Sequence, residues 1–350
     1  IDGGTGNLTA LGALPVSLRG AAAAYAPETG KVYLFGGVSG GAAQSAIYAV
    51  DPLNGATTLL AAVLPEAAFG LAAVHHPGLG KIFVLGGESG GGTRLDRVSV
   101  FDPATESLTP ANFALPAGLS ATAAAYSTAT GTIFTFGGIG EGGPLTNGIY
   151  EIRAEGDGAN GSATAAPVSL ALADAGMAPV EDGASKLIYL LGGSLGDRVL
   201  AFDPLLGQLW KTPGELPGLR YGGVALYSPA NRHALLVGGQ LGNAGQANVW
   251  KFDLGDGPAV KLGHWDFEFA SGTVNDIGSG WDRVIVGANG GATVRTEGSV
   301  SVYTPGTLGG TNVRMVRYDQ ARGRTYFVLD TNRIVYDNGS SIVKLWPNTT

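Results

Sequence analysis

The 350-residue chain is 45% hydrophobic and 14% charged, contains 59 glycines and carries a net charge of -7. This composition supports a large buried core and excludes a disordered low-complexity polymer. The acidic balance argues against nucleic-acid binding, which draws most of its non-specific affinity from a basic surface, and no apolar run reaches the roughly 18 residues of a membrane helix. We therefore expect a globular protein with no nucleic-acid partner and no membrane span.

The chain repeats itself with a period of about 50 residues. Prolines recur at Pro15, Pro65, Pro116, Pro167 and Pro217, at separations of 50, 51, 51 and 50 residues. A glycine pair follows an apolar run in the same order, at Gly36-Gly37, Gly86-Gly87, Gly137-Gly138, Gly192-Gly193 and Gly238-Gly239. Such a period indicates repeated units that each form one supersecondary structure.

The first unit predicts four strands in chain order: Gly20 to Tyr25, Lys31 to Phe35, Ala46 to Val50 and Ala56 to Leu60. A turn joins the first two strands, a glycine-rich loop leads to the third, and Asp51-Pro52 begins the turn before the fourth. Apolar runs bounded by Gly, Pro, Asn and Asp are typical of strands and their turns. Each unit is therefore predicted to be a four-stranded antiparallel meander.

The predicted first strands consist of small residues, as in Ala21 to Ala24, Ala123 to Ala125 and Gly222-Gly223. Alanine is a poor strand former, so a packing reason is required. First strands that converge on a central axis, where only small side chains fit, supply that reason. We therefore predict an all-β propeller in which each unit is one blade.

The pattern resembles the kelch repeat over nearly the whole chain. The resemblance rests on the glycine pair after an apolar strand, as in Tyr33 to Gly37, on the aromatic before Asp-Pro in Phe101-Asp102-Pro103, and on Arg19-Gly20 at the start of a first strand. The family's usual tryptophan in the fourth strand appears only as Trp210. The resemblance implies a kelch-type propeller of the galactose oxidase central-domain-like superfamily. Its copper site needs a cysteine crosslinked to tyrosine, and this chain has 0 cysteines.

The units become irregular toward the C-terminus. The sixth has Gly287-Ala288 in place of the glycine pair, yet Ser301 to Pro305 parallels Ser99 to Pro103. We predict one domain over 1–350 with seven four-stranded blades, six blades being the alternative. Six regular units occupy 14–304, a compressed seventh blade occupies 305–350, and residues 1–13 form an outer strand that closes the ring. Either Ile1 to Leu11 or Ser341 to Trp346 is expected to be the closing strand.

No group of residues predicts catalysis or metal binding. The G-x-S-x-G pattern begins at Gly37, Gly87 and Gly192, in repeat loops without the following helix that a nucleophile elbow requires. His75 and His76 are adjacent and point to opposite faces of a strand, which disfavours a shared zinc ion and favours a surface or packing role. We predict no catalytic residue, no metal and no cofactor.

Polar residues in the loops on one face mark the predicted ligand site. In this topology the loops that join second to third strands, and those that join consecutive blades, share one face, and ligands of propellers commonly bind there. The candidates are Arg19, Glu88, Arg94, Glu141, Arg220, Tyr221, Gln240 and Asn243. Arg19 and Arg220 are the strongest of these because they start first strands beside the channel.

Two classes of function fit these residues. The first is a non-catalytic binding or assembly module that presents loops to a protein or glycan partner, which is what the kelch resemblance most often implies. The alternative is a sugar-active enzyme, mutarotase-like or hydrolase-like, that uses Glu88 or Glu141 with Arg19 or Arg220 as an anion anchor. Two carboxylates within about 10 Å of each other in one funnel would favour the enzyme.

The distribution of charge and the N-x-S/T glycosylation sequences give expectations about partners and location. The last unit is basic, with Arg314, Arg317, Arg322, Arg324, Arg333 and Lys344, which fits either a solvated face or a docking surface for an acidic partner on that blade. N-x-S/T sequences occur at Asn7, Asn160, Asn338 and Asn348. The chain also begins at Ile1 rather than Met, as after processing. We therefore expect a secreted or cell-surface glycoprotein.

Overall fold

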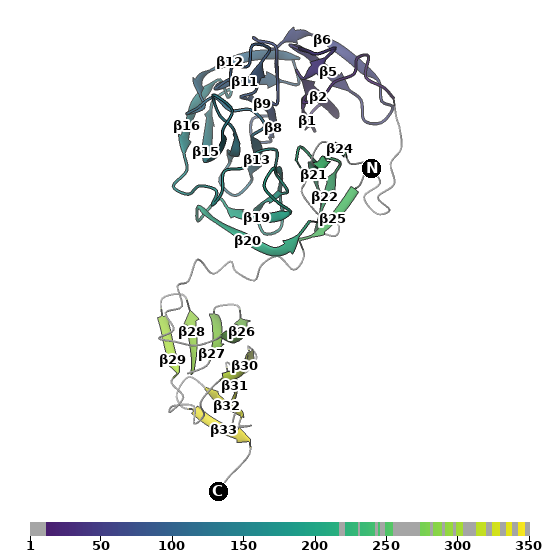
Figure 1. Ribbon diagram of the computed structural model, residues 1–350. Helices are drawn as coiled ribbons and strands as arrows, with labels where there is room; N and C mark the ends of the chain where they lie inside the picture. The colour runs from purple at the N-terminus through teal and green to yellow at the C-terminus, as the bar shows by residue number, and fades with distance from the viewer. Residues whose placement is uncertain are drawn as a thin grey trace. The chain divides into compact units, whose positions relative to one another are not determined.

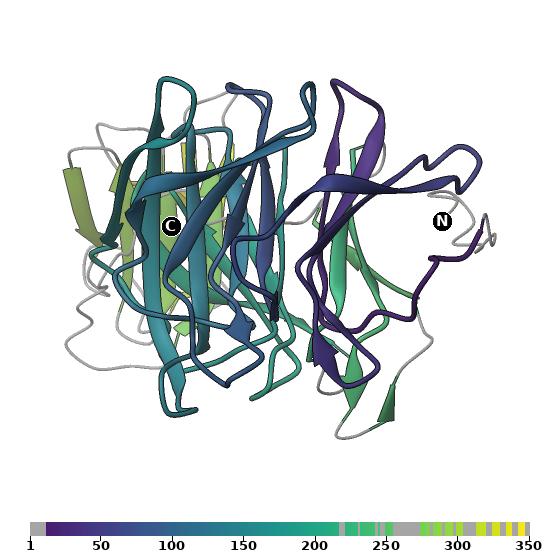
Figure 2. The same ribbon diagram turned by 90° about the horizontal axis from the view of Figure 1, so that it is seen from above.

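The computed structural model describes residues 12–216, 221–229, 232–241, 244–245 and 249–254, together with the eight strands of the C-terminal part. The chain divides into two compact units, Ile1–Gly257 and Pro258–Thr350. Every element drawn in Figures 1 and 2 is a strand, which confirms the all-β prediction for the described residues. In that part of the chain there is no helix that is long and apolar enough to cross a membrane.

Five sheets of the first unit form the blades of a propeller (Figure 1). Blade 1 comprises β1 (Ala22–Ala26), β2 (Lys31–Phe35), β5 (Ala46–Val50) and β6 (Thr57–Val63). Blade 2 comprises β8 (Ala72–His76), β9 (Lys81–Leu85), β11 (Arg97–Asp102) and β12 (Ser107–Ala114). Blade 3 comprises β13 (Ala123–Ser127), β14 (Thr132–Ile139), β15 (Leu145–Glu155) and β16 (Asn160–Ala165). Blade 4 comprises β17 (Ala178–Glu181), β18 (Ile188–Leu191), β19 (Arg198–Asp203) and β20 (Gln208–Glu215), and blade 5 comprises β21 (Val224–Ser228), β22 (His233–Val237) and β25 (Val249–Asp253).

Blades 1 to 4 are four-stranded antiparallel meanders in the predicted order, and blade 5 has the first three of the four predicted strands in the described residues. In blade 1 the register aligns Ala24 with Tyr33, Tyr33 with Ala49, and Ala49 with Thr58. The first strands contact one another from blade to blade in the order β1, β8, β13, β17, β21. Their alanines line a central channel, as the packing of small residues on an axis predicts.

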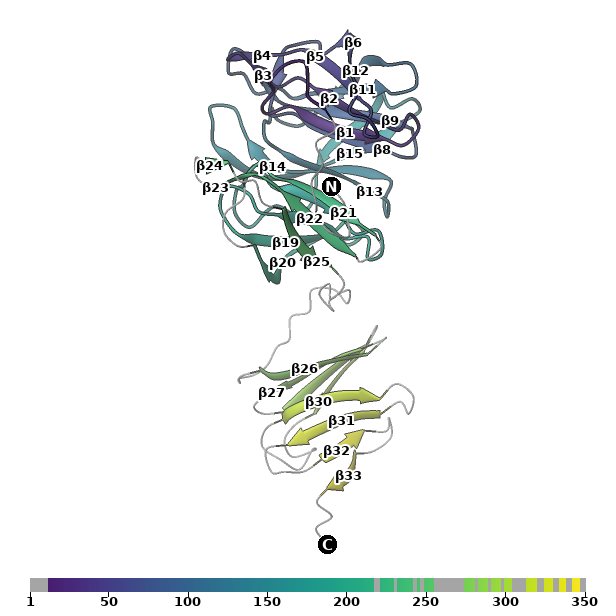
Figure 3. The same ribbon diagram turned by 90° about the vertical axis from the view of Figure 1, so that its right-hand side faces the viewer.

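Short two-stranded ribbons extend from the blades on one side of the propeller. They pair β3 (Val38–Ser39) with β4 (Ala42–Ala43), β7 (Ala68–Phe69) with β10 (Glu88–Ser89), and β23 (Gln240–Leu241) with β24 (Ala244–Gly245). Figure 3 shows β3–β4 and β23–β24 on the same side of the propeller. The loops between second and third strands therefore share one face, as predicted.

The hydrophobic core lies between neighbouring blades. Between blades 1 and 2, the rings of Tyr33 and Phe35 lie 4.8 Å and 5.4 Å from that of Phe101. Between blades 3 and 4, Phe134 and Phe136 pack in the same way on Phe202. An aromatic before the Asp-Pro or Asp turn of one blade thus fills the gap beside the second strand of the blade before it.

The glycine pairs allow adjacent blades to approach closely. In blade 1, a side chain on Gly36 would fall within contact distance of the carbonyl oxygen of Ala68, and Gly37 donates its N–H to that oxygen at 2.8 Å. Both glycines have positive φ, 61° and 100°. The same bond joins Gly87 to Leu119 and Gly138 to Asp174, at 2.7 Å each. The pair is therefore required for blade packing rather than for chemistry.

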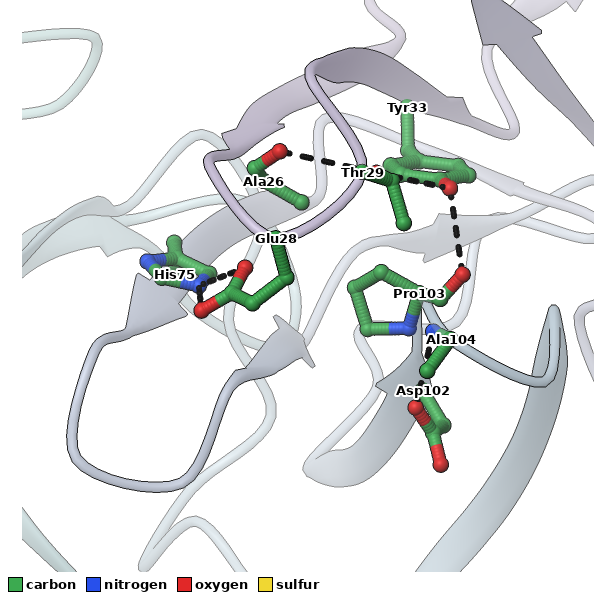
Figure 4. Close-up of polar contacts among 8 residues, drawn as sticks. All are labelled: Ala26, Glu28, Thr29, Tyr33, His75, Asp102, Pro103 and Ala104. Carbon is green, nitrogen blue, oxygen red and sulfur yellow. Dashed lines mark hydrogen bonds and ion pairs between the residues drawn. The ribbon is translucent and has the colours of Figure 1, made fainter.

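Polar contacts between neighbouring hairpins join the blades at the opposite face. His75 binds the carboxylate of Glu28 at 3.0 Å, while the hydroxyl of Tyr33 donates to the carbonyl of Pro103 at 3.3 Å (Figure 4). His76 is buried, and its ring packs on the ring of Tyr126 at 4.6 Å. The two adjacent histidines therefore point to opposite faces and contact different blades, His75 through an ion pair and His76 by ring packing.

The predicted number of seven blades, with six as the alternative, is wrong, because five sheets of the described residues form the propeller. The remaining two sheets belong to the second unit. They comprise β26 (Val274–Gly280), β27 (Arg283–Ala288), β28 (Gly291–Thr296) and β29 (Ser299–Tyr303), and β30 (Val313–Asp319), β31 (Arg324–Leu329), β32 (Ile334–Asp337) and β33 (Ile342–Trp346). The first strand β30 has Met315 to Arg317 where β1 has the small residues Ala22 to Ala24. Such residues do not fit at a crowded central axis.

Of the two predicted closing strands, the structure describes only the C-terminal one. Residues 1–11 lie outside the described residues, so closure by Ile1 to Leu11 stays a prediction. Within the alternative, Ile342–Trp346 forms β33 and pairs with β32 of the second unit. The part of the predicted sixth unit from 258 onward, and the compressed blade over 305–350, fall in that unit.

Candidate functional site

A pocket of about 700 Å³ lies at the mouth of the channel, on the face that carries the ribbons. Two positions of the repeat supply most of its side chains. One is the residue that precedes the bend into each first strand: Arg19, Phe69, Ser120 and Tyr221. The other is the residue that follows each glycine pair: Val38, Glu88, Ile139 and Gln240. Each member of the first set pairs with a member of the second across a β-bridge.

A ring of backbone hydrogen bonds holds these residues at the mouth. The residue at each bend has positive φ, namely Gly20, Gly70, Ala121, Gly176 and Gly222. Its N–H donates to the carbonyl of the equivalent residue in the preceding blade, at 2.7 to 2.8 Å in the four pairs from Gly70 to Gly222. The φ of 51° at Ala121 is strained for a residue with a Cβ. The pocket floor is therefore fixed by the backbone, and its chemistry is set by the side chains on either side.

Glu88 is the carboxylate of the pocket and is held by an arginine. Its Oε2 lies 2.7 Å from Nη1 of Arg94, in an ion pair whose side chains are 22% and 12% exposed. Arg94 is fixed in turn, because its Nη1 also donates to the carbonyl of Gly92 and its backbone N–H donates to Oε2 of Glu141, at 3.2 Å and 3.0 Å. Glu88 therefore keeps a defined orientation and a neutralised charge at the pocket wall.

Tyr221 lies across the mouth and contributes a phenol hydroxyl. Burial raises the pKa of Tyr221, while Arg94 and Glu88 act on that pKa in opposite directions, Arg94 lowering it and Glu88 raising it. Both charges are thus close enough to Tyr221 to influence its hydroxyl. A phenol with a raised pKa stays protonated at neutral pH and donates a hydrogen bond to an acceptor.

Arg19 and Gln240 are exposed at the rim of the pocket. Within the described residues, the side chains of Arg19, Tyr221 and Gln240 make no hydrogen bond or ion pair with another protein group. An unpaired guanidinium offers five donors and an amide offers both donors and an acceptor. The mouth of the pocket therefore presents polar groups that are available to a ligand.

The pocket continues into the channel. A second cavity of about 380 Å³ is lined by the first strands, and its wall shares Gly20, Gly70, Ala121, Tyr221 and Gly222 with the pocket. Its other side chains are small or apolar, such as Ala72, Met177 and Val224. The charged groups are therefore confined to the mouth.

The structure brings together four of the eight predicted ligand residues. Arg19, Glu88, Tyr221 and Gln240 line the pocket. Arg94 and Glu141 support the pocket wall, through the Glu88 ion pair and the Arg94 backbone, rather than lining it. Arg220 and Asn243 lie outside the described residues.

Sequence reasoning missed Phe69 and Ser120, which line the pocket in blades 2 and 3. They occupy the same repeat position as Arg19 and Tyr221, so the 50-residue period could have found them. The pairing of Glu88 with Arg94 was also missed, because it depends on the path of a loop. In the part of the chain that the structure describes, no three His, Asp or Glu side chains are grouped as metal ligands.

Comparison with known proteins supports the fold. No protein-family model matches the chain, and no curated protein matches it. A solved structure described as "Structure of YjhT" is similar, with a TM-score of 0.59 and 19% sequence identity, over 71% of this chain and 85% of that one. At this identity the similarity is one of fold. The chain thus has a β-propeller fold, and its kelch-repeat resemblance stays a prediction.

Proposed function

We propose that this protein is a non-catalytic binding module, of kelch-repeat type, that holds a polar group of a protein or glycan partner at the channel mouth. The observation that carries the proposal is the pocket itself, to which four blades contribute Arg19, Glu88, Ser120, Tyr221 and Gln240. Its volume of about 700 Å³ is in the range of small-molecule sites, roughly 300 to 1,000 Å³.

The side chains suit a ligand rich in hydroxyl groups. Glu88 accepts hydrogen bonds, Arg19 and the Tyr221 hydroxyl donate them, and Gln240 does both. Phe69 adds an apolar wall on the same side as Glu88, since the two residues pair across β7 and β10. A sugar unit has both hydroxyl groups and an apolar face, so the end of a glycan chain fits this combination.

The sugar-active enzyme is the less favoured function. Hydrolysis of glycosides generally requires two carboxylates that flank the scissile bond. Among the described residues that line the pocket, Glu88 is the one carboxylate, and Arg94 neutralises it. The Oε2 of Glu141 binds the Arg94 backbone, and Glu141 does not line the pocket. A binding role needs no second carboxylate, and it is compatible with the ion pair between Glu88 and Arg94.

A glycan-array and pull-down screen with the full chain tests the proposal. We expect a glycan or protein ligand whose affinity falls at least about tenfold, or about 1.4 kcal/mol, in both Arg19→Ala and Tyr221→Phe. Arg153→Ala is the matched control, because Arg153 is 62% exposed on β15 and pairs with Glu151, away from the pocket. A ligand that binds all three variants equally would place the site elsewhere. Chemical conversion of the ligand, followed by NMR, would favour the enzyme.

Secretion and glycosylation form part of the same proposal. Asn160 is exposed on β16, and its side-chain oxygen accepts a hydrogen bond from the amide of Asn112. Asn7, Asn338 and Asn348 lie outside the described residues. Expression in a secretory host would give a mass increase that is lost in Ser162→Ala if Asn160 carries a glycan.

An acidic partner for the basic C-terminal part is a further element of the proposal. Arg314, Arg317, Arg324 and Lys344 lie in β30, β31 and β33. Binding to an acidic partner should weaken steeply with added salt, because exposed charges are screened within about 10 Å at 0.1 M.

A further inference from the structure

One blade lacks a contact that the other four share. The fourth residue of each first strand reaches the hairpin of the preceding blade in blades 2 to 5. His75 binds Glu28 at 3.0 Å, Tyr126 packs on His76 at 4.6 Å, Glu181 accepts the N–H of Thr128 at 2.6 Å, and Tyr227 donates to Asp182 at 2.9 Å. The equivalent residue of blade 1 is Tyr25, which is 50% exposed and makes no such contact with any described residue.

The backbone ring at the channel mouth is open at the same place. Its four hydrogen bonds run from Gly20 to Gly222, and no bond in the described residues joins Gly222 back to Gly20. On the other side of this opening, Val224 and Leu226 of β21 are 59% and 45% exposed. Their counterparts in β1, Ala22 and Ala24, are buried under the next blade. Among the described residues of the propeller, blades 5 and 1 therefore each present an apolar face that no neighbouring blade covers.

The free face of blade 1 contains a groove. In blade 2, Ile82, Val84 and Phe101 are fully buried against blade 1. The residues of blade 1 at the same register positions are Val32, Leu34 and Val50, which are only partly buried and line a groove of about 460 Å³. Gly12, Ala13 and Leu14 form another wall of this groove. An apolar groove on an otherwise repeated packing face needs an occupant.

We propose that residues Ile1 to Leu11 of this chain dock in the groove on the free face of blade 1. The chain enters the described structure at Gly12, where a Cβ would lie 2.9 Å from the carbonyl oxygen of Gly55, at one end of the groove. The eleven preceding residues can extend about 36 Å at about 3.3 Å per residue, whereas a five-residue strand spans about 17 Å. Ile1, Leu8 and Leu11 supply apolar side chains for it.

The docked segment is joined to the rim of the ligand pocket by a short stretch of chain. Residues 12–18 connect the groove directly to Arg19, which pairs with Val38 at the pocket rim. Docking of Ile1 to Leu11 anchors one end of this connection. This proposal does not depend on the proposed ligand, and it differs from a closing strand at the outer edge of the last blade.

Disulfide trapping in the full chain tests the docking directly, because the chain has 0 native cysteines. Leu34→Cys is combined in turn with a cysteine at Gly6, Leu8 or Ala10. We expect at least one pair to form an intramolecular disulfide ten times faster than the control pair Leu8→Cys with Leu205→Cys, where Leu205 is 62% exposed on blade 4. Disulfides between copies would assign the groove to a second molecule, and equal rates in all pairs would also overturn the proposal.

A thermal unfolding experiment gives an independent test. Leu34→Asp is introduced into the full chain and into a chain that begins at Gly12. If the segment covers Leu34, the charge lowers the Tm of the full chain and has a much smaller effect on the shortened chain. An equal effect on both chains would contradict the docking, whatever the folding yield of the cysteine variants.

Discussion

Asp182 joins blades 4 and 5, and replacing it by asparagine should weaken the propeller in a pH-dependent way. Its side chain is 0% exposed. Oδ2 accepts hydrogen bonds from Arg232 and from the Ser185 hydroxyl, both at 2.6 Å, while Oδ1 accepts from Tyr227 at 2.9 Å. Asparagine keeps one oxygen but places an N–H₂ group against donors on the other side. The bonds to Arg232 and Ser185 are then lost together.

The magnitude follows from these contacts. Loss of the Ser185 hydrogen bond costs about 1 kcal/mol. The ion pair adds only about another 1 kcal/mol, because the Arg232 side chain is 35% exposed and water screens it. The total of about 2 kcal/mol corresponds to a Tm decrease of about 4 to 8 °C for a domain of this size. Asp157→Asn is the control, since Asp157 is exposed and accepts one turn hydrogen bond, from Ala159; we expect a change below about 0.5 kcal/mol.

The pH dependence of stability distinguishes the contribution of the Asp182 charge from that of side-chain packing. The pKa of Asp182 lies well below its usual range, because hydrogen bonds from Arg232, Ser185, Ala184 and Tyr227 outweigh the opposing effect of burial, the largest single influence. A carboxylate with a lowered folded pKa stabilises the protein above its unfolded pKa, about 3.9, and loses that contribution as pH falls toward the folded value. Urea unfolding should therefore show a difference between wild type and Asp182→Asn that is about 1 kcal/mol smaller at pH 3 than at pH 7. A difference that is the same at both pH values would refute this reasoning.

Three further substitutions test the packing between blades. Gly36→Ala should lower the free energy of unfolding by more than about 2 kcal/mol, because the added Cβ clashes with the adjacent blade. The control Gly40→Ala should lower it by about 1 kcal/mol, since Gly40 has a similar φ but open space around it. Burial lowers the pKa of His76, so the neutral form is favoured in the folded state; stability should decrease from pH 7 to pH 5, and His76→Phe should remove that decrease in urea titrations. Tyr33→Phe should cost about 1 kcal/mol in the same assay by removing the hydroxyl that contacts the Pro103 carbonyl and the Thr29 hydroxyl. No change in Tyr33→Phe would show that these contacts contribute nothing net.

The strands of the propeller could be predicted because each obeys a local rule. Predicted strands over Lys31 to Phe35 and Ala46 to Val50 coincide with β2 and β5, and Gly20 to Tyr25 overlaps β1. Apolar runs, glycine pairs and Asp turns all lie within one repeat, so a single period is enough to locate them. The number of blades is a property of the whole ring, and the parallel between Ser301 to Pro305 and Ser99 to Pro103 was a misleading guide to it. The first strands offered the better signal, since β30 has Met315 and Arg317 where β1 has Ala22 and Ala24.

The position of the pocket could be predicted from the sequence, but the ion pair between Glu88 and Arg94 in its wall could not. Arg19 and Tyr221 were found because they stand just before first strands, which must begin at the channel mouth. Arg94 was expected to face a ligand, yet it is bound to Glu88, because the turn at Gly92 folds the loop back. Contacts of this kind depend on the conformation of a few loop residues, which no repeat pattern encodes.

The asymmetry of the pocket has a specific cause in blade 4. In the other four blades the residue after the glycine pair lines the pocket, but in blade 4 this residue is Ser194. Its N–H and hydroxyl both donate to Oδ1 of the buried Asp174, at 2.7 Å and 2.8 Å. Because Ser194 is used internally, blade 4 contributes no side chain to the pocket. A ligand should therefore contact blades 1, 2, 3 and 5, and changes at Ser194 should affect stability more than binding.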